Sequence, residues 1–328
     1  MYLIDKINAL VSQQVVPGIS FAYLTADHLE RRQVGLNTWL PQETALPANP
    51  LYDLASLTKV IGTTTVLLHL IEQKVLSTET PICQYLPEFT DQRVALRHLM
   101  THTSGIQGYI PQRDCLSGKE LIKALVKLPV TSNFNQVIKY TDTGPILAGL
   151  IIEKIYHQPV QSVIEQVVLQ PLGLTTATFQ PQPQNCVITS SKMGKNLQGV
   201  VQDPKAQQLG CHCGSAGLFA SLNDVIRFSQ FMLGQLTITQ APIQDATIKK
   251  LFHSFTPVLP GRSFGWDLRW NCLGEAVLYH TGYTGNFLAI DRQRQQALIV
   301  LSNRVHPFNN NQRFLSARNA IMELFLQS

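Results

Sequence analysis

Charged residues are scarce in this 328-residue chain: Asp, Glu, Lys and Arg make up 14%, against 45% hydrophobic residues. Disordered chains combine low hydrophobicity with high net charge, so this composition excludes disorder and predicts a folded body with a sizeable core. The net charge is +5, but the basic residues are scattered, and Arg31 and Arg32 form the densest cluster. Nucleic-acid binding usually needs a basic stripe interleaved with aromatic residues, so we expect no nucleic-acid partner.

Long hydrophobic runs are also missing. The most apolar stretch, 60–71, is interrupted by Gly62, three threonines and His69, so it predicts a buried helix and no membrane span. The N-terminal segment lacks a basic head followed by an apolar core and a small-residue cleavage site. We therefore expect a cytoplasmic protein, or an extracytoplasmic one if a leader has been trimmed from the sequence.

Cysteine is sparse and irregularly spaced, with six residues and no framework of paired spacings. This pattern fits reduced thiols better than a disulfide scaffold. Cys211, His212 and Cys213 stand together, but no second ligand pair follows at the spacing of a zinc site. We expect no metal there.

Hydrophobic spacing predicts regular elements at both ends of the chain. Apolar residues recur at helical spacing from Leu3 to Val11, and the extended runs 19–24 and 31–36 follow a Pro-Gly break. A last helix has an apolar face that starts at Phe314. Strand-like alternation returns before it, in segments 264–270, 276–282, 286–291 and 296–302.

Strands at both ends and mainly helical segments between them predict an α/β plus all-α fold. One antiparallel sheet is flanked by the terminal helices, and a helical domain is inserted in its middle. We expect residues 1–53 and 222–328 to form the sheet domain and residues 54–221 the helical domain. The active site is expected in the cleft between them.

Ser56 and Lys59 form an S-x-x-K motif that leads into the apolar helix. Their i,i+3 spacing places both side chains on one helical face, within mutual reach. A serine hydroxyl needs a base to become a good nucleophile, and a lysine serves if desolvation or a neighbouring cation lowers its pKa. Taken alone, the motif is equally compatible with a serine near a helix N-cap followed by a surface lysine.

Three further segments follow the S-x-x-K motif in order: LRHLMTHTSGI (96–106), YTDTG (140–144) and HTGYTG (280–285). With them the chain resembles the penicillin-recognising serine hydrolases. The resemblance is to the branch of class C β-lactamases, low-molecular-mass penicillin-binding proteins, D-aminopeptidases and esterases of that fold. It covers nearly the whole chain, since segments 217–221 and 301–307 are similar as well. It implies the β-lactamase/transpeptidase-like fold.

The resemblance implies three catalytic residues. Ser56 is the acylated nucleophile, and Lys59 takes or relays its proton. Tyr140 matches the tyrosine of a Y-x-N motif, which protonates the leaving group and activates the deacylating water. An ordinary tyrosine at the edge of the core is the alternative for Tyr140.

The same resemblance implies the substrate-binding residues. His280, Thr281 and Gly282 match a K-T-G motif, whose strand lies along the cleft and aligns the substrate. The backbone N–H groups of Ser56 and Tyr283 are expected to form the oxyanion hole, aided by the helix N-terminus at the serine.

Two residues depart from the family pattern. Asp142 stands where class C β-lactamases have asparagine. An amide that donates and accepts hydrogen bonds is thus replaced by a carboxylate that only accepts them. His280 stands where the motif has lysine, so a permanent cation is replaced by a group whose charge depends on pH. Both changes favour an esterase or peptidase over an efficient β-lactamase.

Two other catalytic arrangements are compatible with the sequence. Residues 261–265 spell G-x-S-x-G, the nucleophile elbow of α/β-hydrolases, but prolines precede it and a strand-like run follows, where the elbow needs a strand and then a helix. Ser56, His280 and Asp142 could form a triad, but the lysine would then have no role. His102 is expected to satisfy backbone groups in its turn.

The sequence therefore predicts a serine hydrolase that acts through an acyl-enzyme on ester, D-amino-acid peptide or β-lactam bonds. The mechanism requires no metal or organic cofactor. The expected partner is a small molecule or short peptide, and the oligomeric state is left open. The alternatives are a sensor that binds penicillin or peptidoglycan peptides with little turnover, and a structural protein on this fold.

Overall fold

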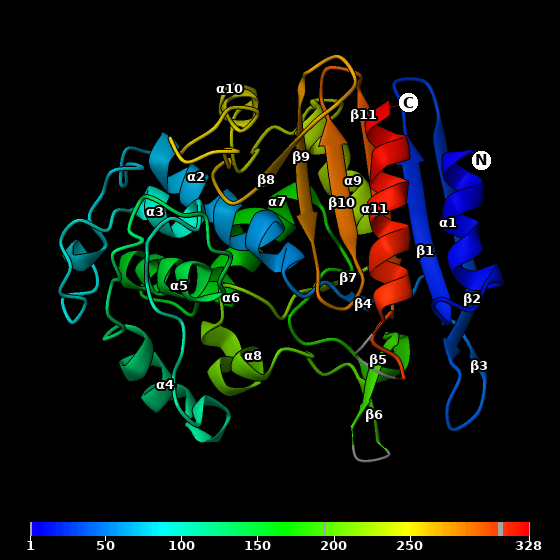
Figure 1. Ribbon diagram of the computed structural model, residues 1–328, viewed down its shortest axis with the longest axis horizontal. Helices are drawn as coiled ribbons and strands as arrows, with labels where there is room; N and C mark the ends of the chain where they lie inside the picture. The colour runs from blue at the N-terminus through cyan, green and yellow to red at the C-terminus, as the bar shows by residue number, and fades with distance from the viewer. Residues whose placement is uncertain (1, 193–194, 308–310, 328) are drawn as a thin grey trace.

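A seven-stranded antiparallel sheet forms one side of the molecule (Figure 1). The structure is a computed structural model and describes residues 2–192, 195–307 and 311–327. The strands lie in the order β3-β2-β1-β11-β10-β9-β8, so the first strand of the chain pairs with the last. They are β1 (Gly18–Leu24), β2 (Leu29–Thr38), β3 (Thr44–Ala45), β8 (Asp267–Trp270), β9 (Ala276–Thr281), β10 (Phe287–Asp291) and β11 (Gln296–Ser302). The predicted antiparallel sheet is confirmed.

Both faces of the sheet are buried at its centre, because alternate residues of a strand point to opposite sides. In β1, Phe21 packs into one hydrophobic cluster and Ala22 into the other. In β11, Val300 and Ile299 divide in the same way. The central strands therefore read as continuous apolar runs in the sequence.

Helices cover both faces of this sheet (Figure 1). α1 (Leu3–Ser12) packs beside α11 (Gln312–Gln327), and the buried residues of these two terminal helices belong to the cluster of Phe21. α9 (Leu222–Leu233) contacts β1, β10 and β11 from the opposite face. The terminal helices thus flank the sheet as the sequence predicts.

The remaining helices gather on the other side of the molecule (Figure 1). They are α2 (Thr64–Glu72), α3 (Leu96–Met100), α4 (Gly118–Leu125), α5 (Thr143–Tyr156), α6 (Val160–Ile164), α7 (Gln170–Leu172), α8 (Pro204–Leu209) and α10 (Asp245–Lys250). Among the described residues, no helix is long and apolar enough to cross a membrane. The division into domains at residues 53/54 and 221/222 stays a prediction.

Three short strands lie within residues 54–221, which the sequence predicts as mainly helical, and they belong to two small sheets. β4 (Tyr52–Asp53) pairs with β7 (Phe219–Ala220), and β5 (Ile188–Lys192) pairs with β6 (Lys195–Gln198). β4 and β7 have two residues each, which is too short for a period of two to be recognised. The β4–β7 pair nevertheless joins the segment before Ser56 to the segment before α9.

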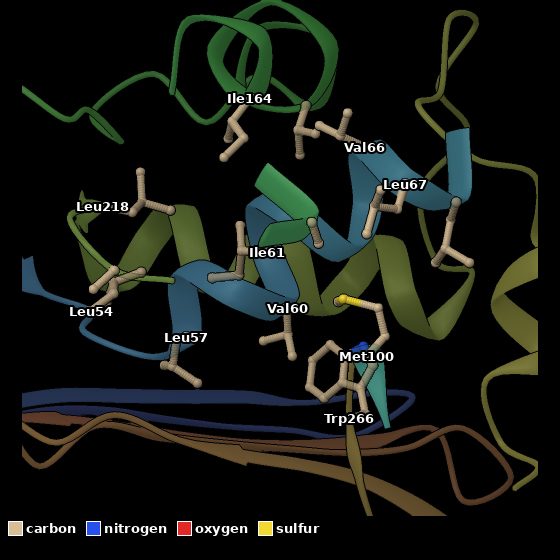
Figure 2. Close-up of a cluster of buried hydrophobic side chains, with 14 of the residues drawn as sticks. Leu54, Leu57, Val60, Ile61, Val66, Leu67, Met100, Ile164, Leu218 and Trp266 are labelled. Atoms are coloured by element: carbon tan, nitrogen blue, oxygen red, sulfur yellow. The ribbon is translucent and has the colours of Figure 1, made fainter. Parts of the chain in front are cut away.

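A buried helical segment, residues 57–72, lies at the centre of the core and consists of a π-helical turn (Lys59–Thr63) followed by α2. Figure 2 shows Val60 and Ile61 of this segment among the apolar side chains around it, and both are 1% exposed. This confirms the predicted buried helix. Lys59 itself is 1% exposed, so its side chain is buried within this core.

Candidate active site

Ser56 lies in the turn after β4. Ala55 before it has a φ of +46°, a left-handed conformation that residues other than glycine rarely adopt. The N–H of Ala55 donates to Oδ1 of Asp53 over 2.9 Å, which holds this conformation. The carbonyl of Asp53 also accepts hydrogen bonds from the side chains of Thr284 and Asn286, each over 2.7 Å. The serine turn is thereby tied to the turn that follows β9.

Lys59 donates to three acceptors: Oγ of Ser56 at 2.6 Å, the carbonyl oxygen of Ser215 at 3.0 Å and Oδ1 of Asp142 at 2.8 Å. An ammonium group has three donors, so all are used. Burial opposes the charge of Lys59, but Tyr140 and Asp142 outweigh it, and the pKa of Lys59 lies above its ordinary value. The base role considered for Lys59 required a lowered pKa. In the structure, the pKa of Lys59 is raised instead.

Asp142 bridges two lysines. Its Oδ1 accepts from Lys59, and its Oδ2 accepts from Nζ of Lys205, which follows Pro204 at the start of α8. Burial raises the pKa of Asp142, but the charges and hydrogen bonds of the two lysines outweigh burial and hold it well below the ordinary range. Asp142 is therefore an ionised, acceptor-only carboxylate at neutral pH, as the sequence predicts.

Tyr140 stands half-exposed over this charged group. Nζ of Lys59 lies 5.3 Å from the centre of its ring, and Cζ of Arg262 lies 5.6 Å from it. The imidazole rings of His102 and His280 lie 4.5 Å and 5.9 Å away. Two cations and two imidazole rings thus surround the ring of Tyr140.

His280 and Thr281 are the last residues of β9, and Gly282 begins the turn. Burial, followed by the charges of Arg262 and Lys59, holds the pKa of His280 well below its ordinary value. His280 is therefore a neutral imidazole at neutral pH. The sequence predicts a charge at this position that depends on pH. Because the pKa of His280 is so low, the ring becomes charged only at a pH below the neutral range.

A cleft of about 490 Å³ brings several of the predicted residues together. Within the described part of the chain, no acceptor is bonded to the backbone N–H of Ser56 or of Tyr283. Both residues line the cleft, so the two N–H groups expected for the oxyanion hole belong to residues at its wall. The cleft is also lined by Tyr140, Asp142 and Thr281 of the predicted site, whereas Lys59, His280 and Gly282 are not among the described residues that line it.

Sequence reasoning missed three residues of this site: Lys205, Ser215 and Arg262. The Asp-Pro start of α8 is a recognisable helix signal, but it indicates nothing about an ion pair with Asp142. Arg262 lies inside the G-x-S-x-G segment, which was considered for its serine. That serine, Ser263, has no exposed surface, so it cannot act as a nucleophile on a substrate.

His102 has the structural role that the sequence predicts, with a different partner. Its side chain is buried, and its Nδ1 accepts the N–H of Thr141 over 3.3 Å. Burial lowers the pKa of His102 well below its ordinary value, so the ring is neutral. It holds the segment that carries Tyr140 by this bond and by a tilted contact with the phenol ring.

The fold and the serine–lysine pair at the cleft define a hydrolase of the β-lactamase/transpeptidase class. The chain belongs to the Beta-lactamase family, whose sequence model matches residues 3–320. It is a serine hydrolase of this family, and the resemblance predicted from its motifs is confirmed.

Curated relatives and solved structures agree with this assignment. The chain is 26% identical over 315 residues to "Putative D-alanyl-D-alanine carboxypeptidase" of Escherichia coli (strain K12), which covers 81% of this chain and 72% of the relative. It is 26% identical over 316 residues to "N-acetylmuramyl-L-alanine amidase" of Bacillus subtilis (strain 168), covering 81% and 71%.

Two solved structures show the same fold at lower identity. A class C β-lactamase superposes with a TM-score of 0.81 at 17% identity, over 99% of this chain and 94% of the other. A β-lactamase/D-alanine carboxypeptidase from Pseudomonas syringae gives 0.79 at 17% identity, over 98% and 97%.

Proposed function

We propose that this protein hydrolyses short peptides with a C-terminal D-amino acid, through an acyl-enzyme on Ser56. The contact of 2.6 Å between Lys59 and Ser56, beside two free backbone N–H groups, carries the proposal. A positioned serine next to an oxyanion hole is the arrangement that acyl transfer requires.

Tyr140 is the proton acceptor in this proposal. Lys59 already holds three acceptors as an ammonium, so it cannot take the serine proton in that state. The proton of Ser56 passes to the phenolate oxygen of Tyr140 while Oγ attacks the carbonyl carbon. Tyr140 then gives this proton to the leaving amine as the C–N bond breaks. In the second half, Tyr140 accepts a proton from the water that attacks the acyl ester and returns it to Oγ of Ser56 as the ester bond breaks.

Arg262 supports the choice of a peptide that ends in a carboxylate. It is 7% exposed, its Nε has no hydrogen-bond partner among the described residues, and its Nη1 lies 3.5 Å from Asp267. Its Cζ lies 5.6 Å from the ring centre of Tyr140, which lines the cleft. A buried cation close to Tyr140, the residue that protonates the leaving amine in this proposal, attracts a terminal carboxylate. Since His280 is neutral, Arg262 is the permanent charge that the lysine of a K-T-G motif would otherwise supply. The names of the carboxypeptidase relatives favour the same substrate class.

The test is to label and assay the full chain. A fluorophosphonate probe is expected to label the wild type and to leave Ser56→Ala unlabelled; equal labelling of both would disprove the proposal. An N-acylated D-alanyl-D-alanine peptide is expected to release D-alanine with turnover, more efficiently than a nitrophenyl ester or a chromogenic cephalosporin. One equivalent of acylation without turnover would instead support the penicillin-binding sensor.

A further inference from the structure

Lys205 approaches the catalytic group through Asp142. Its Nζ binds Oδ2 of Asp142, while Lys59 binds Oδ1 of the same carboxylate. The Lys205 side chain is 15% exposed and lies 3.7 Å from Asp203, at the N-terminus of α8. Ion pairs on the surface contribute little to stability, because water and salt screen them. The pair of Lys205 and Asp142 is mostly buried, so its charges are screened less.

The pair of Asp142 and Lys205 has the net charge of the asparagine that it replaces in the family pattern. An ionised carboxylate next to Lys59 favours protonation of the groups around it, and a neutral amide does not. The second ammonium, bound to the far oxygen, opposes this effect, while the near oxygen binds Lys59. The ion pair of Asp142 and Lys205 thus takes the place of the side-chain amide of one asparagine.

We propose that Lys205 is a positioning residue that acts on the pair of Lys59 and Tyr140. This pair must lose one proton before it can accept the proton of Ser56, and Lys205 sets the pH at which that loss occurs. This inference rests on the proposed function. It holds whichever of the two groups carries the remaining proton, because a nearby positive charge favours the deprotonated form of the pair in either case.

Other groups that face this pair do not titrate in the same range. His102 and His280 have a pKa well below the ordinary value and are neutral. Arg262 stays charged at any pH at which the protein is assayed. The charged and titratable groups around the pair are Asp142 from the segment before α5, Asp203 and Lys205 from α8, His102 from the turn after α3, Arg262 from the loop before β8, and His280 from β9.

The test measures the second-order rate of probe labelling at Ser56 from about pH 5 to pH 10 in four variants. Lys205→Met keeps the stem length and removes the charge, so the midpoint of the acid limb is expected to rise by about one pH unit and the neutral rate to fall about tenfold. Lys205→Arg keeps the charge and the wild-type midpoint. Asp142→Asn lowers the midpoint, and the double variant Asp142→Asn, Lys205→Met brings it back close to the wild type.

The control is Lys249→Met, which removes a lysine that pairs with Asp245 over 2.9 Å but is 65% exposed on α10. It is expected to leave the profile unchanged. A Lys205→Met rate that falls equally at every pH, or a double variant that keeps the midpoint of Asp142→Asn, would overturn the inference. If Lys205→Met alone does not fold, the comparison of Asp142→Asn with the double variant decides. A wild type that is not labelled at Ser56 refutes the proposed function itself.

Discussion

Gly282 lies directly against the backbone that leads to Ser56: a Cβ on Gly282 would stand 2.5 Å from the carbonyl oxygen of Leu54. Real Cβ atoms do not approach backbone that closely, so only glycine lets the end of β9 reach the serine turn. The contact brings the turn that carries Tyr283 against the backbone that leads to Ser56, the two residues of the proposed oxyanion hole.

Gly282→Ala is therefore expected to push the β9 turn away from Ser56. Displacing an oriented group by about 1 Å costs about 100-fold in rate, so probe labelling at Ser56 should fall by about that factor. Gly108→Ala is the control, because its Cβ would meet nothing closer than 3.5 Å. Equal labelling of the two variants would show that the close approach has no role in acylation.

Tyr140→Phe keeps the ring over Lys59 and removes the hydroxyl. If Tyr140 moves the proton, turnover should fall by about 100- to 10,000-fold, the usual contribution of a general acid–base group. The thermal unfolding midpoint should hardly change, because Tyr140 is 46% exposed. Tyr156→Phe, at the far end of α5, serves as the control and should keep full turnover. An active Tyr140→Phe would return the base role to Lys59.

The loss of activity in Arg262→Gln should depend on the charge at the C-terminus of the substrate. We expect kcat/KM to fall by about 10- to 100-fold for a peptide that ends in a carboxylate, the value of a charge-assisted hydrogen bond, and to fall less for the same peptide capped as an amide. Arg269→Gln is the matched control, because Arg269 pairs with Asp267 as Arg262 does, but its side chain is 50% exposed. A carboxylate-to-amide ratio equal to that of the wild type would exclude Arg262 as the recognition residue.

Asp53 should make stability depend on pH. Burial raises the pKa of this carboxyl from 3.8 to about 6, so between these values the folded chain binds more protons than the unfolded chain. The free energy of unfolding therefore falls as the pH rises from about 4 to about 6. This stabilisation is fully present below that window and is lost above it.

The variant Asp53→Asn lacks this titration. The difference in unfolding free energy between the wild type and the variant, measured by urea unfolding, is expected to change by up to about 3 kcal/mol across the window. A constant difference from pH 4 to pH 6 would mean that Asp53 titrates near its ordinary value. The variant also replaces one of the two acceptors, for Ala55 and Gln202, by a donor, so probe labelling at Ser56 should slow.

The sequence alone determined the main elements of the fold and the order of the catalytic motifs. β11 begins and ends where the strand-like run 296–302 predicts, because both faces of this strand are buried and residues 297–301 are all apolar. The i,i+3 spacing of Ser56 and Lys59 is a local property, and it brought the two side chains together as predicted.

Only the tertiary structure decided the charge state of the site. Lys205, Ser215 and Arg262 reach Lys59, Asp142 and Tyr140 from segments far along the chain, and no local period or spacing encodes such contacts. Burial and paired charges then reverse what the residue types suggest: Lys59 becomes more basic, and His280 stays neutral. A pKa depends on the dielectric surroundings and on charges within a few ångströms, and both exist only once the chain has folded.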